Sequence, residues 1–158
     1  LLPGSRRDVL SNTLVVVVPA ATRQVPATLV DLAGPGFPRI AIGLPASVPV
    51  GRYTQSVLEA ARLWDAIEPR MVGAGNVRQA LDYVALGEVD AGFVYATDAA
   101  VMPGRVRVAF TVPTPRRITY PAAQLRAAPE PAAAARFLEY LRTPAAQALL
   151  ARHGFGRP

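Results

Sequence analysis

Short apolar segments separated by turn residues recur along this chain and predict a series of strands. Leu14–Val18 is rich in β-branched residues and lies between Asn12 and Pro19, so it is predicted to form a buried strand. Further strands are predicted at Arg39–Gly43, Arg70–Val72, Asp90–Tyr95, Arg105–Val112 and Arg117–Leu125. Arg105–Val112 alternates polar and apolar residues, which indicates a half-buried or edge strand.

Apolar residues at helical spacing predict helices between and after these strands. The first is expected to begin directly after Pro49, with its pattern carried through Trp64. The second is capped by Asn76 and ends at Gly87. A short helix is expected at Thr97-Asp98, and the tail predicts two more, at Pro131–Leu141 and from Thr143-Pro144 through Arg152. Alternation of strands with helices of about ten residues is typical of an α/β fold with a mainly parallel sheet.

Composition narrows the chemistry that this chain can perform. A length of 158 residues is typical of one domain, or of one domain and part of another. The residues are 51% hydrophobic and 18% charged, which is sufficient to form a buried hydrophobic core. The formal net charge is +6, and all 17 basic residues are arginines scattered along the chain. Scattered charge argues against a nucleic-acid footprint, while the basic balance favours anionic ligands.

The residues that most enzymes and metal sites require are scarce. There is no cysteine, and the single His153 lies in the glycine-rich tail, so thiolate chemistry, a histidine metal site and a Ser-His-Asp triad are all disfavoured. The longest apolar run, Leu14–Ala21, is too short to span a membrane and contains a proline. Because the sequence opens at Leu1-Leu2-Pro3-Gly4, we expect a fragment or a processed form.

Three positions at strand ends or helix starts could bind an anion. Val50 and Val77 each lie in the first turn of a predicted helix, where backbone N–H groups lack intrahelical partners and the helix dipole is positive. Tyr95 ends the strand DAGFVY, at the edge where α/β sheets usually bind ligands. Each position also has a structural explanation, because most helix starts bind only water and a tyrosine at a strand end commonly belongs to the core.

Several short motifs resemble the second lobe of the periplasmic molybdate-binding proteins of ABC transporters. They are VPVGRY, the LW turn, the NVRQAL helix start, GFVYATDA, ITYPAAQL and the tail FLEYLRTPAAQALLARHGF. The resemblance extends from about Asn12 to Phe155. It implies a class II periplasmic-binding-protein-like lobe with hinge strands and C-terminal helices. It also implies a periplasmic location and a membrane permease as partner.

In that family, backbone N–H groups and hydroxyls from two lobes hold the oxyanion without charged side chains. The resemblance therefore implies three ligand-binding groups: the N–H of Val50, the N–H of Val77 and the hydroxyl of Tyr95. Molybdate, with tungstate, would be the ligand, bound as an oxyanion and not through metal–ligand bonds, and no cofactor or catalytic residue is implied. Leu44 departs from the family pattern, which usually has an acidic residue or Asn there.

In the family, serine-bearing loops of the first lobe supply the remaining hydroxyl and amide ligands. That first lobe has no counterpart in this sequence. We expect residues 1–12 to be a remnant of the connection to the first lobe and residues 13–125 to be the second lobe with its hinge strands. Residues 126–158 are expected to be helices that pack on the first lobe. Leu14–Val18 and Ile118–Leu125 are expected to lie side by side as hinge crossings. Alone, the chain is expected to bind molybdate poorly and to self-associate, with a second copy covering five apolar residues: Phe137, Leu138, Leu141, Leu149 and Leu150.

Three other functions remain open at this point. A ligand-sensing domain of a transcription regulator shares the two-lobe architecture, although no helix-turn-helix is visible here. A binding protein for phosphate, sulfate or another oxyanion would need similar donors. An enzyme is the least favoured class, because general acid–base groups are lacking.

Overall fold

The computed structural model describes residues 1–158 and divides the chain into two compact units. The larger unit is Thr13–Arg116, and the smaller unit joins Leu1–Asn12 to Arg117–Pro158. The first boundary coincides with the one expected after residue 12. The second falls after Arg116 and not after residue 125, because the strand that follows it pairs within the smaller unit.

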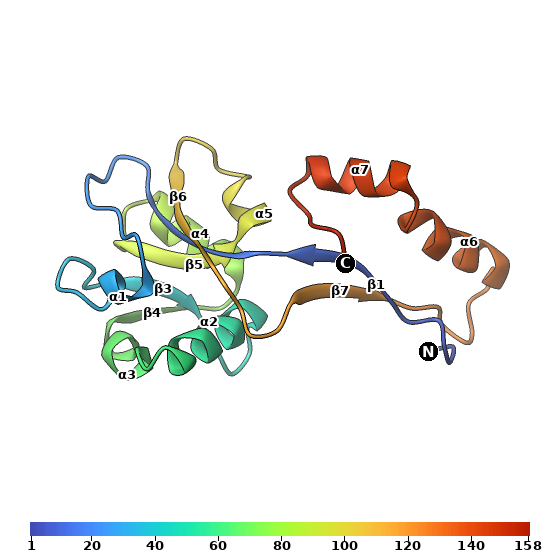
Figure 1. Cartoon of the computed structure of the whole chain (residues 1–158), viewed down its shortest axis with the longest axis horizontal. Helices are drawn as coiled ribbons and strands as arrows, with labels where there is room; N and C mark the ends of the chain where they lie inside the picture. The colour runs from blue at the N-terminus through green and yellow to red at the C-terminus, as the bar shows by residue number, and fades with distance from the viewer. The chain divides into compact units, whose positions relative to one another are not determined.

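The larger unit is built on a five-stranded sheet with the order β4-β3-β5-β2-β6 (Figure 1). Its strands are β2 (Leu14–Pro19), β3 (Ile40–Gly43), β4 (Met71–Ala74), β5 (Ala91–Tyr95) and β6 (Val106–Val112). β3 is parallel to β4 and β5, whereas β2 is antiparallel to both β5 and β6. The α/β class is confirmed, but the sheet is mixed. The reason is that β2, which brings the chain into this unit, runs opposite to the other four strands.

Helices cover both faces of this sheet. They are α1 (Leu29–Leu32), α2 (Pro49–Ala60), α3 (Trp64–Ile67), α4 (Val77–Ala85) and α5 (Ala96–Ala99), with a 3-10 turn at Glu68–Arg70. Figure 1 shows α2 and α3 on one side of the sheet and α4 and α5 on the other. The first long helix was predicted to continue to Trp64, but it ends at Ala60 because Arg62 adopts a positive φ of 58°.

β2 lies at the centre of the core, since both of its faces are covered. Leu14–Val18 is a run of five apolar residues, each at most 2% exposed. Val15 and Val17 pack in one cluster with Leu81 and Val84 of α4, and the alternate residues of β2 point to the opposite face. Burial on both faces explains why this strand reads as a continuous apolar run instead of an alternating one.

The first turn of α2 is packed directly onto the end of β3, and two glycines make this possible. A Cβ added to Gly51 would lie 1.9 Å from the carbonyl oxygen of Gly43. A Cβ added to Gly43 would lie 2.8 Å from Val48 and 2.9 Å from Val50. The motif VPVG therefore fixes the position of the α2 N-terminus against the sheet.

The smaller unit contains a two-stranded sheet and two helices. Its elements are β1 (Arg7–Asn12), β7 (Ile118–Ala122), α6 (Pro131–Leu141) and α7 (Pro144–Arg152). β1, which no sequence pattern indicated, pairs antiparallel with β7 and brings Asn12 opposite Ile118. The predicted pairing of Leu14–Val18 with Ile118–Leu125 is therefore wrong, because the partner of β7 is β1.

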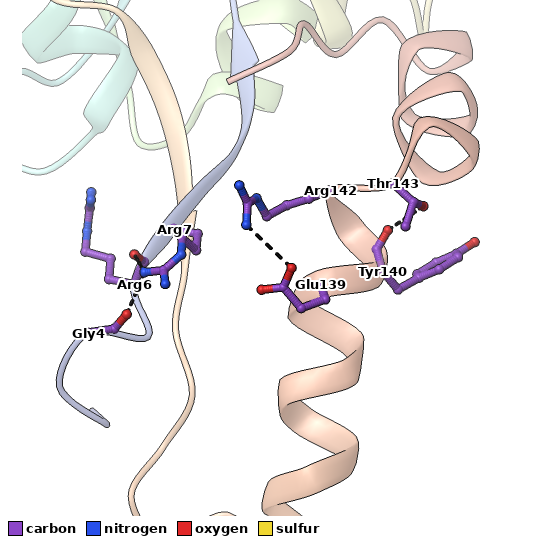
Figure 2. Close-up of polar contacts among 7 residues, drawn as sticks. All are labelled: Gly4, Arg6, Arg7, Glu139, Tyr140, Arg142 and Thr143. Atoms are coloured by element: carbon purple, nitrogen blue, oxygen red, sulfur yellow. Dashed lines mark hydrogen bonds and ion pairs between the residues drawn. The ribbon is translucent and has the colours of Figure 1, made fainter.

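A local hydrogen-bond network joins the two helices of the smaller unit. The Thr143 hydroxyl donates to the Tyr140 carbonyl at 2.7 Å (Figure 2). It also accepts from the Ala146 N–H at 3.3 Å. Arg142 and Glu139 form an exposed ion pair at 3.5 Å, drawn in the same view. Thr143 thus caps α7, as the sequence predicted.

The apolar residues of α6 and α7 are poorly covered. No residue of α6 is buried, and Phe137 and Tyr140 are 59% and 49% exposed. On α7, Leu149 is 42% exposed, while Ala146 is buried. An apolar helix face left in this state is typical of a surface that packs against another protein segment.

Gly51→Ala is expected to destabilise the larger unit by about 1–3 kcal/mol, because the added methyl group would overlap the Gly43 carbonyl and push α2 off the sheet. Urea unfolding measures the change. Gly75→Ala is the matched control, since its Cβ would meet only the Gln79 side chain at 3.4 Å. Equal stability of the two variants would contradict the proposed role of Gly51.

Candidate functional site

The three candidate residues lie at one edge of the larger unit's sheet. β3 and β4 are parallel and in register, with Gly43 opposite Ala74, and β5 runs in the same direction on the other side of β3. α2 follows β3 and α4 follows β4, so both helices begin at the carboxyl edge of the sheet. Tyr95, the last residue of β5, lies at this edge as well. Such an edge is where open α/β sheets bind ligands.

The first turn of α2 offers one unpaired backbone donor. Val48 is the N-cap and makes no side-chain capping bond, while its carbonyl accepts from Gly51 at 3.0 Å and from Arg52 at 3.3 Å. The N–H of Val50 has no hydrogen-bond partner in the chain. The Val50 side chain is only 1% exposed. Its packing against Gly43 holds the amide in place, so the branched side chain serves to fix the backbone.

The first turn of α4 is capped more completely and still leaves donors unpaired. The Asn76 side chain accepts from the Gln79 N–H at 2.9 Å, and the Gln79 side chain accepts from the Gly75 N–H at 2.6 Å. These two bonds satisfy the N–H groups of Gly75 and Gln79. The N–H groups of Val77 and Arg78 have no partner in the chain. They are oriented by a rigid cap, as an anion-binding turn requires.

Tyr95 is held at the junction of β5 and α5. It pairs with Leu14 across the β5–β2 ladder, and the next residue, Ala96, donates its N–H to the Thr13 carbonyl at 2.9 Å. The Asp98 carboxylate accepts the Tyr95 N–H. The Tyr95 side chain is half-buried, so its position is set by the sheet end on one side and by the α5 turn on the other.

One ion pair lies beside these groups. A guanidinium nitrogen of Arg78 is 3.8 Å from an Asp98 carboxylate oxygen, with the two side chains 46% and 16% exposed. Burial raises the pKa of Asp98 above its ordinary value, against the opposing effects of Arg78 and of the Tyr95 N–H. The pair is long and half exposed, so its net contribution to stability is small. Its larger effect is to neutralise Arg78 near the start of α4.

This edge of the sheet supplies hydrogen-bond donors suited to an anion. Two helix starts contribute backbone N–H groups without protein acceptors, and a helix N-terminus carries partial positive charge. No group of three or more His, Cys, Asp or Glu residues in the structure could hold a metal ion. No helix of the structure is long and apolar enough to cross a membrane.

Sequence reasoning located the three candidate residues but missed the contacts that position them. The close approach of Gly51 to Gly43 was not visible from spacing. Neither was the role of Arg70, whose guanidinium donates to the carbonyls of Ala33 and Gly34 at 2.6 and 2.7 Å and closes the end of α1. In the sequence, these contacts are indicated only by Gly51 at the start of a helix and by Arg70 just before β4. Neither residue type specifies the partner that it contacts.

The comparisons with known proteins agree with this architecture. The family described as "Bacterial extracellular solute-binding protein" matches residues 1–156. The "Molybdate-binding protein ModA" of Escherichia coli (strain K12) is 34% identical over 160 residues, covering 96% of this chain and 61% of its own length. The chain thus spans less than two thirds of that relative.

Two solved structures are similar over nearly the whole chain. One is the "substrate binding domain of putative molybdenum ABC transporter from Clostridium difficile", with a TM-score of 0.87, 29% identity, and coverage of 100% of this chain and 69% of the other. The second is the periplasmic molybdate-binding protein of Azotobacter vinelandii, with a TM-score of 0.80 and 31% identity, covering 99% and 70% of the two chains.

The raised pKa of Asp98 predicts a pH dependence of stability with a definite sign. Between the ordinary value of 3.8 and the raised folded-state value, the native protein binds more protons than the unfolded chain. The contribution of Asp98 to the free energy of unfolding therefore falls as the pH rises through that window.

Urea unfolding at a series of pH values should show this fall for the parent chain, and Asp98→Asn should remove it. Asp65→Asn, which changes an exposed carboxylate outside any ion pair, is the control and should leave the slope unchanged. A parent-minus-Asp98→Asn difference that grows with pH would contradict the assignment.

Proposed function

Because this chain belongs to the family of bacterial extracellular solute-binding proteins, we propose that it is part of the solute-binding component of an ABC transporter for molybdate. In this proposal the N–H of Val50, the N–H of Val77 and the hydroxyl of Tyr95 bind the oxyanion. The observation that carries the proposal is the pair of unpartnered amides at helix starts on one sheet edge. The molybdate-binding names of similar proteins support the choice of ligand.

Neutral donors suit a fully deprotonated tetrahedral dianion. Each of its oxygens is an acceptor, so a cage made only of N–H and O–H donors satisfies it. A protonated anion would carry an O–H group that finds no acceptor in such a cage. Removing a dianion from water is costly unless several donors are aimed at it. Fixed backbone amides supply this orientation without the entropy that a long charged side chain would lose.

Size discrimination follows from the rigidity of such a cage. Amides held by capped helix starts and by the Gly51–Gly43 contact cannot shift toward a smaller anion such as sulfate. Tungstate is nearly the same size as molybdate, so the same cage would accept both. We therefore propose tungstate as a second ligand. Binding makes or breaks no bond, so the proposed activity is transport and not catalysis.

Three donors are too few to surround a dianion, so further ligands are proposed to come from another lobe. The E. coli relative is longer than the matched segment, which leaves room for such a lobe in the complete protein. The exposed apolar face of α6 and α7 would pack against that lobe or, in the isolated chain, against a second copy. The remaining partner would be a membrane permease, with the binding protein outside the cytoplasmic membrane.

Val77→Pro tests the amide ligand directly. Val77 is the first residue of α4, where proline is well tolerated, and Asn76 already has the extended backbone (φ −163°, ψ 169°) that a following proline requires. The substitution removes one N–H that has no partner in the chain. In the protein with both lobes, molybdate affinity measured by calorimetry is expected to fall at least about tenfold, the value of a hydrogen bond to a charged group.

Val77→Ala is the matched control, because it shortens the side chain and keeps the N–H. It should bind molybdate nearly as the parent does. If the proline and alanine variants lost affinity equally, the Val77 amide would not be a ligand.

Tyr95→Phe tests the hydroxyl. Removing it should weaken molybdate binding in the two-lobe protein by about 1–3 kcal/mol, because one oxygen of the dianion loses its donor. Tyr83→Phe on α4, outside the proposed donor set, is the control. Unchanged molybdate affinity in Tyr95→Phe would make Tyr95 a structural residue only.

A further inference from the structure

A pocket lies along the side of α2, and its lining begins at Pro49, the residue before Val50. Its volume is about 440 Å³, and six residues line it: Pro49, Arg52, Tyr53 and Ser56 of α2, and Pro115 and Arg116 of the connection after β6. The four α2 positions are spaced three, four and seven residues from the first, so they form one stripe on the helix. The opposite wall comes from a segment more than 50 residues away in the sequence.

The polar groups of this pocket are all donors without partners. The guanidinium groups of Arg52 and Arg116 make no hydrogen bond or ion pair, since the ion pairs of the chain involve other arginines. The hydroxyls of Tyr53 and Ser56 also have no hydrogen-bond partner in the structure. No acidic residue lines the pocket. The nearest acid along α2, Glu59, accepts from the Gln55 side chain at 2.7 Å.

We propose that this pocket is a second anion-binding site, for a small organic anion with two or more carboxylate groups. Two guanidinium groups can each bind a carboxylate in a bidentate manner, and the two hydroxyls can donate to the remaining oxygens. The rings of Tyr53, Pro49 and Pro115 offer apolar walls to a short carbon skeleton. The volume lies within the range of small-molecule sites and exceeds what a single tetrahedral oxyanion would fill.

The two sites of α2 differ in chemistry. The proposed oxyanion site uses the backbone N–H of Val50, whereas Pro49 has no N–H and this pocket binds through side-chain charge. An anion held by both Arg52 and Arg116 would also join α2 to the last residues of the larger unit, just before the chain enters the smaller one. Occupancy should therefore slow amide exchange at Thr114 and Arg116, the two residues of this connection that carry an N–H.

Citrate is the probe, titrated into the 158-residue chain at low ionic strength and followed by calorimetry and NMR shifts of Tyr53. The double variant Arg52→Gln/Arg116→Gln is expected to weaken citrate binding at least about tenfold, as loss of two charge-assisted contacts implies. Arg23→Gln/Arg39→Gln removes the same charge from exposed positions outside the pocket and should bind citrate as the parent does. Acetate, with one carboxylate, should bind far more weakly than citrate.

A second variant and a competition experiment separate this site from the proposed oxyanion site. Ser56→Asp places a carboxylate beside the two arginines and should abolish citrate binding without loss of the fold. In the protein with both lobes, saturating molybdate should leave citrate affinity unchanged. Equal loss in the two double variants would reduce the effect to net charge and overturn the proposal, as would displacement of citrate by molybdate. Failure of molybdate to bind the protein with both lobes would count against the transport function and leave the citrate result intact.

Discussion

The close packing of the first turn of α2 against the end of β3 is the constraint on which the rest of the larger unit depends. The Gly43 carbonyl occupies the space where a side chain at position 51 would begin, and Val48 and Val50 close over Gly43 from the other side. This contact sets where α2 starts, and therefore where its unpaired amide lies relative to the ends of β3, β4 and β5. Because a backbone contact of this kind has no rotamer freedom, it positions the amide more rigidly than a side-chain hydrogen bond would.

Rigid placement matters because the candidate site contains almost no charge of its own. The guanidinium of Arg78, at the start of α4, is opposed by the Asp98 carboxylate, so attraction for an anion there comes mainly from oriented N–H groups and helix dipoles. Such groups contribute little to anion affinity if they can reorient and donate to water instead. The reciprocal bonds between Asn76, Gln79 and Gly75 prevent this at α4, and the glycine contact does the same at α2.

Features encoded by neighbouring residues were predicted well, and features that depend on distant pairing were not. The bounds of α6 and α7 and the caps at Asn76 and Thr143 follow from local residue choice, and the structure confirms them. The reversed direction of β2 and the pairing of β1 with β7 join segments about 80 to 110 residues apart, which no local pattern reports. The candidate site combines both kinds of feature. Each donor could be recognised from its neighbours in the sequence, but the position of the donors at one sheet edge depends on the parallel register of β3 and β4.

Taken together, the two proposed sites would give α2 two kinds of anion recognition. At the start of α2, the backbone donor of the proposed oxyanion site has a fixed direction, so it would select by the size and shape of an oxyanion. At the proposed second site along its flank, the guanidinium groups of Arg52 and Arg116 would select by charge and by the spacing of carboxylates. Pro49, which lines the pocket and precedes Val50, has no N–H, so it offers the pocket no backbone donor. Screening by salt acts mainly on the exposed arginines, which makes ionic strength the variable that separates the two modes of binding.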